Sequence, residues 1–392
     1  MVKTRIKFAA YIANTFDSPS FHIPIILFYG NQYLGLTITT TLLAFYGVNF
    51  LTAFFEIPAG AFGDRYGRKI SYILGIILLL VGYGIWLLRI PTYWYFIGSA
   101  IAGLGNAFRS GSIDAMVYEE SHLANAMDLY DGFRSKSKAW YYVFRIVAMP
   151  LGSYLFTVSP TLPMLLTIIT IFCSGLSVIF IPDNNVTPEE KSAFLLMFAT
   201  FKKILSNKES VLFILVIFSM GAIGDFAWRL FQVIYKTSNL NIAYIGIFYG
   251  VTSIFSTYGS LKFGKRSKRD DVIKLSILTY FITTCTVTVL AVFLNIWVAL
   301  VVVIIQSISF ALPETSIQTY LQTKSERFEQ ATILSITSFV FFFGLSVSDV
   351  LAGISISIFG LQGAFIFNAT LCLVITMIFV PKLFKTLKVD SH

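Results

Sequence analysis

Phe-Glu-Ile-Pro-Ala-Gly-Ala-Phe-Gly-Asp-Arg-Tyr-Gly-Arg-Lys, residues 55–69, is the stretch that decides the fold. It connects two apolar runs of membrane-spanning length, and its charges gather between them. Gly67 permits a tight turn in this short connection. Asp64 is an anion suited to the positive N-terminal end of a neighbouring helix. The stretch therefore predicts two membrane helices joined by a charged surface loop.

The composition excludes an ordinary soluble globule. Of 392 residues, 56% are apolar and 12% charged, whereas soluble domains have about 45–50% and about 25%. The net charge of +9 comes without a nucleic-acid module, so nucleic acid is not an expected partner. The cysteines lie in apolar runs and predict packing residues rather than disulfides or a metal site. They are Cys173, Cys285 and Cys372.

Hydropathy predicts twelve spans of about 20 residues or more. They are 7–30, 37–63, 70–90, 93–118, 137–158, 161–182, 210–235, 240–263, 272–294, 297–320, 330–358 and 361–382. The only long polar segment predicts a cytoplasmic linker at 183–209, between an N-terminal bundle, 1–182, and a C-terminal bundle, 210–392. Predicted cytoplasmic segments hold 24 of the 29 Lys and Arg residues, which places both termini in the cytoplasm of a multi-pass cell-membrane protein.

The charged loop recurs half a chain later. Arg-Tyr-Gly-Arg-Lys at 65–69 matches Lys-Phe-Gly-Lys-Arg at 262–266, and this spacing is close to half of the 392 residues. The match favours a duplicated repeat. Leu261 stands where the second copy would carry an Asp, which weakens the expectation of an equivalent contact there.

Residues 55–69 resemble the signature between the second and third helices of the major facilitator superfamily. The matching positions are Gly60, Asp64, Arg65, Gly67, Arg68 and Lys69. The resemblance implies an all-α polytopic membrane protein with 12 transmembrane helices in two six-helix pseudo-symmetric bundles. It also implies alternating access by a monomer.

The resemblance further implies a gate at the cytoplasmic side. Asp64 is expected at the N-terminus of the eleventh helix, near Ala331, and the basic residues of the signature are expected to pair with Glu119 and Glu120. This arrangement would hold the halves together when the cytoplasmic side is closed. The alternative interpretation is that these charges only fix the orientation of the chain.

Nine ionisable residues lie within predicted spans, where unpaired charges are costly and commonly line transport pathways. They are Asp17, Glu56, Arg109, Asp114, Arg145, Asp225, Arg229, Glu314 and Asp349. Spans 3, 6, 9 and 12 carry none in their interiors. In the superfamily these four form the outer scaffold, whereas 1, 4, 7 and 10 line the cavity.

Asp17 is the leading predicted proton site. It and Arg109 both lie about 14–15 Å from the cytoplasmic ends of their spans, so contact is possible between neighbouring helices. Resemblance to drug/proton antiporters also points to a first-helix carboxylate and a fourth-helix Arg. Here Ser110 and Gly111 follow the Arg, which departs from the usual pattern of those antiporters. A static buried pair that fixes helix packing is the alternative.

The other candidates lie mainly in the C-terminal half. Asp225 and Arg229 have the i,i+4 spacing of an intrahelical ion pair, and Pro313 predicts a kink beside Glu314. The predicted coupling residues are Asp17, Arg109, Asp225 and Glu314. The predicted substrate-binding residues are Arg109, Asp114, Arg145, Asp225, Trp228, Arg229 and Glu314. Static packing is the alternative for the second-half charges, although an aromatic such as Trp228 suits an amphipathic ligand.

These residues favour a secondary transporter that exports a small amphipathic or drug-like molecule in exchange for protons. The alternative is proton-coupled solute uptake or lipid translocation, because the intramembrane charges include three Arg. The chain lacks zincin and Gly-x-Ser-x-Gly motifs, which argues against a membrane enzyme. The expected partners are a small substrate, protons and the bilayer, with no cofactor or metal.

Overall fold

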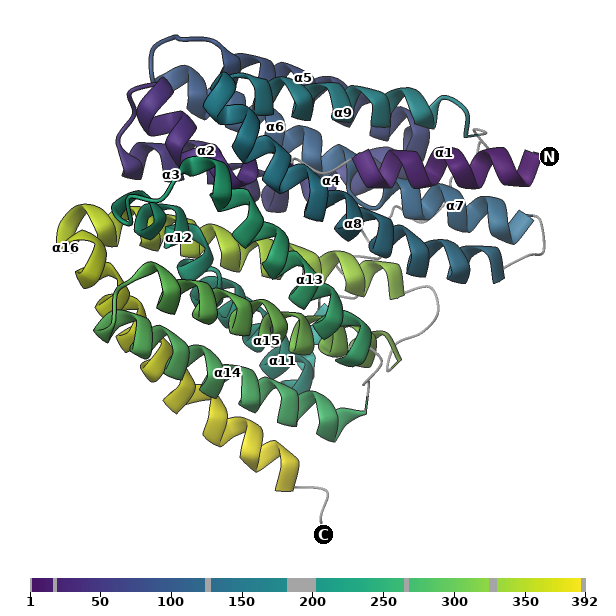
Figure 1. The fold of residues 1–392 in the computed structure, drawn as a ribbon. Coiled ribbons are helices and arrows are strands. Elements are labelled where there is room, and N and C mark those ends of the chain that lie inside the picture. Colours follow the sequence, from purple (N-terminus) through teal and green to yellow (C-terminus); the bar gives the residue numbers. More distant parts are fainter. Residues whose placement is uncertain are drawn as a thin grey trace. The chain divides into compact units, whose positions relative to one another are not determined.

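The computed structural model describes residues 2–16, 20–123, 128–181, 202–263, 268–323 and 330–388. Every regular element in these ranges is helical, which confirms the predicted all-α class (Figure 1). By contacts the chain forms two units. Unit 1 comprises 1–36, 44–194 and 241–250, and unit 2 comprises 37–43, 195–240 and 251–392. The predicted boundaries at 182 and 210 place 37–43 in the N-terminal bundle and 241–250 in the C-terminal bundle. By contacts, 37–43 belongs to unit 2 and 241–250 to unit 1.

The helices follow one another with short connections. The first part of the chain forms α1 (Val2–Phe16), η1 (Ile23–Ile25), α2 (Ile26–Phe28), η2 (Tyr29–Tyr33), α3 (Ile38–Tyr46), α4 (Val48–Tyr66), α5 (Arg68–Leu87), α6 (Tyr93–Arg109), α7 (Ser112–Leu123), α8 (Asp128–Val158) and α9 (Leu162–Val178). The rest forms α11 (Lys208–Gly224), α12 (Phe226–Thr237), η3 (Ile242–Tyr244), α13 (Ile245–Phe263), α14 (Arg269–Val292), α15 (Ile296–Thr323) and α16 (Gln330–Lys388). Gly360, with φ 68°, interrupts α16 between the predicted spans 330–358 and 361–382.

The second predicted span is divided at Gly47 into α3 and α4, and three further spans that hydropathy predicts as continuous helices are interrupted. In the first of these spans, α1 ends at Phe16, and three short helical turns, η1, α2 and η2, follow later in the span. The first of these turns, η1, has a proline within its first two positions. The fourth breaks between α6 and α7 at Gly111, whose φ of 67° does not fit an α-helix. The seventh breaks at Asp225, with φ −84° and ψ −8°, between α11 and α12. All of these breaks fall in spans that carry predicted site residues.

Glycines bring the helices of unit 1 together at backbone distance. A Cβ at Gly75 on α5 would lie 2.6 Å from the Gly105 carbonyl oxygen on α6, and a Cβ at Gly82 would lie 2.6 Å from the Gly98 oxygen. Such contacts exclude any side chain. Membrane helices associate largely through close packing of this kind, since lipid gives no hydrophobic drive for their association. These glycines therefore fix α6, which carries Arg109 at its end.

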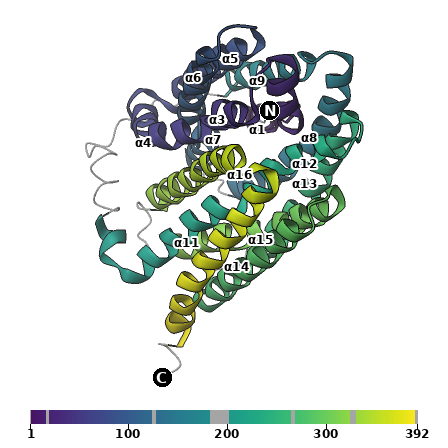
Figure 2. The same ribbon diagram turned by 90° about the vertical axis from the view of Figure 1, so that its left-hand side faces the viewer.

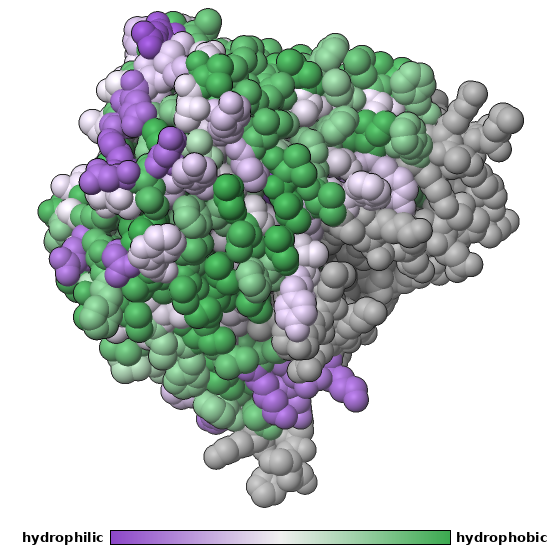
Figure 3. Space-filling model, in the orientation of Figure 1, coloured by the Kyte–Doolittle hydropathy of each residue, from purple (hydrophilic) through white to green (hydrophobic). Residues whose placement is uncertain are grey.

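The outer face of several helices is apolar. On α9, Leu165, Ile169, Phe172 and Leu176 are 39–53% exposed and repeat every three or four residues, which defines one side of the helix. Apolar side chains also cover much of the face in Figure 3. Six helices of the described residues are long and apolar enough to cross a membrane, and three shorter ones are apolar. These surfaces suit contact with lipid.

Unit 2 contains α11, α14, α15 and the two parts of α16. Figures 1 and 2 show α14 and α15 side by side, and α16 packs against both α11 and α14. A Cβ at Gly221 on α11 would lie 2.8 Å from the Phe341 carbonyl oxygen on α16. Gly344 on α16 in turn lies against the backbone of Phe218. This contact sets the register of α11 against α16.

Candidate functional site

A cluster of three charged side chains lies inside unit 2. Arg229 Nε on α12 is 2.7 Å from Asp225 Oδ2 and 2.8 Å from Asp349 Oδ1 on α16. The side chains of Arg229 and Asp349 are 7% and 3% exposed, and that of Asp225 is 23% exposed. The predicted i,i+4 pair is present, and a second carboxylate from another helix joins it. We call these three residues the charge cluster.

The local fold explains how the charge cluster forms. Gly221 and Gly344 bring α11 and α16 together about one turn before Asp225 and Asp349, respectively. Asp225 then ends α11, and its main-chain oxygen accepts a hydrogen bond from Arg229 N at 2.9 Å as α12 begins. The two carboxylates consequently approach the same guanidinium from two helices.

Further side chains surround the break at Asp225. Asn368 is fully buried, and its Nδ2 is 3.5 Å from the Ile223 carbonyl oxygen, at the end of α11. The Phe226 ring packs edge-on against Phe365 at 5.9 Å. The Arg229 guanidinium lies 5.2 Å from the centre of the Trp228 ring, within cation–π range. Aromatic and amide groups thus support the end of the broken helix.

The charge balance of the cluster determines its chemistry. Two ionised carboxylates and one guanidinium carry a net charge of −1. Burying a net charge is costly, and binding one proton to either carboxylate removes it. A cationic ligand would have the same effect. The arrangement is therefore suited to exchange a proton or a cation at a buried position.

The predicted residues of unit 1 are not gathered into such a cluster in the described part of the chain. Arg109 Nη2 donates to Asn106 Oδ1 at 2.8 Å, within its own helix. Asp17, the expected partner of Arg109, lies outside the described residues. Arg145 Nη1 is 3.5 Å from the Tyr141 hydroxyl, and Asp114 is exposed in the first turn of α7. The side chain of Glu314 also lies outside the described residues.

The signature loop forms the predicted tight turn. Gly67 has φ 102° and separates α4 from α5. A Cβ at Gly63 would lie 3.2 Å from the side chain of Arg68, whereas one at Gly60 would meet nothing within 4 Å among the described residues. The guanidinium of Arg65 lies 5.3 Å from the centre of the Tyr66 ring.

Lys69 makes a contact that the sequence did not predict. Its Nζ donates to the Ile179 and Ile181 oxygens at 3.0 and 2.8 Å, just beyond the end of α9. A cation suits that position because the carbonyl end of a helix is negative. The side chains of Asp64, Glu119 and Glu120 lie outside the described residues, so the gate itself stays a prediction.

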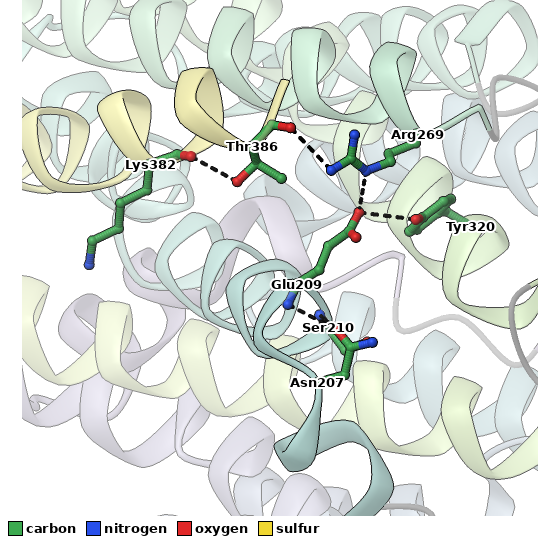
Figure 4. A network of polar contacts seen from close by, with 7 residues as sticks. All are labelled: Asn207, Glu209, Ser210, Arg269, Tyr320, Lys382 and Thr386. Atoms are coloured by element: carbon green, nitrogen blue, oxygen red, sulfur yellow. Dashed lines mark hydrogen bonds and ion pairs between the residues drawn. The ribbon is translucent and has the colours of Figure 1, made fainter. Parts of the chain in front are cut away.

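Unit 2 contains a related contact at the start of α14. Arg269 Nη2 donates to the Thr386 oxygen on α16 at 3.1 Å, and its Nε is 2.7 Å from Glu209 Oε1. Tyr320 donates to the same Glu209 oxygen at 3.0 Å, and Asn207 caps the start of α11 (Figure 4). In both units, then, a cation at the start of a helix binds main-chain oxygens at or just beyond the end of the last predicted span of that half.

Sequence reasoning missed one member of the charge cluster. Asp349 belongs to the predicted intramembrane charges, yet nothing in its spacing points to Arg229. Its only signal is an acid within a long apolar run, which is expensive unless it is paired. Among the described residues, no group of His, Cys, Asp and Glu has an arrangement that could hold a metal ion.

Comparison with known proteins decides the family. Residues 8–348 match the sequence profile of the Major Facilitator Superfamily. The chain belongs to this superfamily. It is therefore a transporter by family, and the match covers the signature loop and, in the charge cluster, Asp225 and Arg229. None of the curated protein sequences searched matches the chain.

Solved structures of transporters share the fold along nearly the whole chain. The nucleoside transporter NupG has a TM-score of 0.74 at 14% identity, with 98% of this chain and 99% of that one covered. A POT family transporter in complex with 5-aminolevulinic acid has a TM-score of 0.69 at 15% identity, with 96% of each chain covered. The human organic anion transporter MFSD10 has a TM-score of 0.67 at 12% identity, with 96% and 99% covered. At these identities the likeness concerns the fold of this superfamily.

Proposed function

We propose that this transporter exchanges protons for a small amphipathic solute, with the charge cluster as a proton-binding site. The observation that carries the proposal is that two carboxylates share one buried guanidinium. One proton neutralises the cluster and weakens the ion pair between the protonated carboxyl group and Arg229. Proton binding can thereby change the contact between the helix break at Asp225 and α16.

The chemistry around Arg229 also supports an amphipathic substrate. Trp228 offers an aromatic ring beside the guanidinium, and such a surface binds flat or cationic groups. The resemblance of Asp17 and Arg109 to the first-helix carboxylate and fourth-helix Arg of drug/proton antiporters favours export. Asp17 and Arg109 are a second predicted coupling pair, in unit 1.

The test uses the full chain in proteoliposomes that hold a pH gradient, with ethidium as the amphipathic probe. We expect ethidium to discharge the gradient, and we expect Asp225→Asn and Asp349→Asn each to reduce this response at least tenfold. Asp270→Asn is the matched control, because Asp270 is an exposed acid at the start of α14. If uridine, and not ethidium, moves together with the protons, the export hypothesis is wrong and the alternative of proton-coupled solute uptake is favoured.

A second prediction concerns the proposed gate at the signature loop. We expect Asp64→Asn to insert and fold normally but to slow ethidium transport several-fold, because the amide loses the charge attracted to a helix N-terminus. Asp64→Glu keeps the charge and should retain more activity. Initial transport rates, corrected for the amount of protein in the membrane, provide the measurement. Wild-type turnover in Asp64→Asn would contradict a gating role.

A further inference from the structure

A second carboxylate lies at a helix break, in unit 1. Glu56 on α4 accepts a hydrogen bond at Oε1 from the Ser110 hydroxyl at 3.1 Å. Its other oxygen, Oε2, is buried and has no hydrogen-bond partner among the described residues. Ser110 directly precedes Gly111, where the fourth span breaks. A neutral hydroxyl is thus the one contact that the Glu56 carboxyl makes there.

The charged groups of the neighbouring helices are engaged elsewhere. α4 packs against α5 and α6. On α5, Arg68 lies against Gly63 and Lys69 binds the end of α9. On α6, Arg109 donates to Asn106 at 2.8 Å. Beyond the break at Gly111, the next acid along the chain is Asp114, which is exposed in the first turn of α7. In the described part of the chain, no ion pair includes Glu56.

A carboxylate without a cation is expensive in such surroundings. A buried acid without a cation usually keeps its proton, because an unpaired neutral hydroxyl costs far less free energy than an isolated buried charge. A proton on Oε2 removes the charge and leaves Oε1 to accept the Ser110 hydroxyl. The geometry of the contact fits the protonated acid.

We propose that Glu56 is a proton-binding site that is loaded in this conformation and controls the break between α6 and α7. When the proton leaves to water, the carboxylate becomes negative and attracts the Arg109 guanidinium away from the neutral Asn106 oxygen. Arg109 is the last residue of α6, and Gly111 has the backbone freedom to absorb its movement. Proton release at Glu56 therefore reorients the two halves of the fourth span.

Infrared spectroscopy of the full chain in lipid tests the proton directly and needs no substrate. We expect a C=O band of a protonated carboxylic acid at neutral pH, and its loss in Glu56→Gln. Ser110→Ala should keep the band but move it to higher frequency, because the carbonyl loses its hydrogen-bond donor. Glu209→Gln is the matched control and should keep the wild-type band, since Glu209 is paired with Arg269.

Titration tests the link to Arg109. In Arg109→Gln the ionised carboxylate has no cation to attract, so the band should persist to a pH higher by about one unit or more. A wild-type band that is absent, or that Glu56→Gln leaves unchanged, would overturn the proposal. If Glu56→Gln does not fold, Ser110→Ala and Arg109→Gln decide instead, because both retain the acid. Unchanged band position and titration in both would likewise overturn the proposal.

Discussion

Replacing Arg229 with Gln will abolish proton-driven ethidium transport and strongly destabilise the protein. The substitution leaves Asp225 and Asp349 close together without a cation, and Asp349 is almost completely buried. Removing one partner of a buried ion pair costs about 3–5 kcal/mol, because the remaining charge is uncompensated. Thermal unfolding in detergent, followed by size-exclusion chromatography, measures the loss. Proteoliposome assays measure transport.

A triple variant separates stability from coupling. In Asp225→Asn, Arg229→Gln, Asp349→Asn all three charges are gone, and replacing a whole buried ionic cluster by neutral groups is often close to neutral for stability. We expect the triple variant to recover most of the stability lost in Arg229→Gln while transport stays absent. A triple variant no more stable than the single one would show that charge pairing is not the cause of the loss.

The charge cluster also shows how far sequence reasoning reaches. The i,i+4 spacing predicted the pair of Asp225 and Arg229, because both ends lie on one short segment. Asp349 comes from a distant helix, and whether it faces Arg229 depends on the rotation of α16 about its axis. The Gly221–Gly344 contact fixes that rotation. In a single apolar sequence, a glycine at a helix contact cannot be distinguished from one that faces open space.

The same limit applies to the spans themselves. Hydropathy predicted the spans and a boundary near Gly360, because both depend on average composition over many residues. It did not predict the breaks at Gly111 and Asp225, which depend on the conformation of one or two residues. Nor did the sequence predict that Lys69 contacts main-chain oxygens at the end of α9, since main-chain acceptors leave no mark in the sequence.

Gly82→Ala will prevent normal folding or lower thermal stability sharply. The added methyl group would lie 2.6 Å from the Gly98 oxygen and 2.8 Å from Ala102 N, so α5 and α6 must separate. Backbone atoms cannot move aside as the end of a side chain can. Overpacking in a well-packed core costs about 1–3 kcal/mol, and the loss of neighbouring Gly75–Gly105 contacts adds to it. Yield of monodisperse protein and melting temperature are the measurements.

Gly84→Ala is the matched control, two residues further along α5. A Cβ there would meet nothing within 4 Å among the described residues. Alanine is also the better helix former, by up to about 1 kcal/mol, so this variant should be as stable as wild type or more stable. The two variants have the same change in sequence and the same helix, and they differ only in what the methyl group meets. Equal destabilisation by both would mean that α5 depends on glycine for flexibility rather than for its contact with α6.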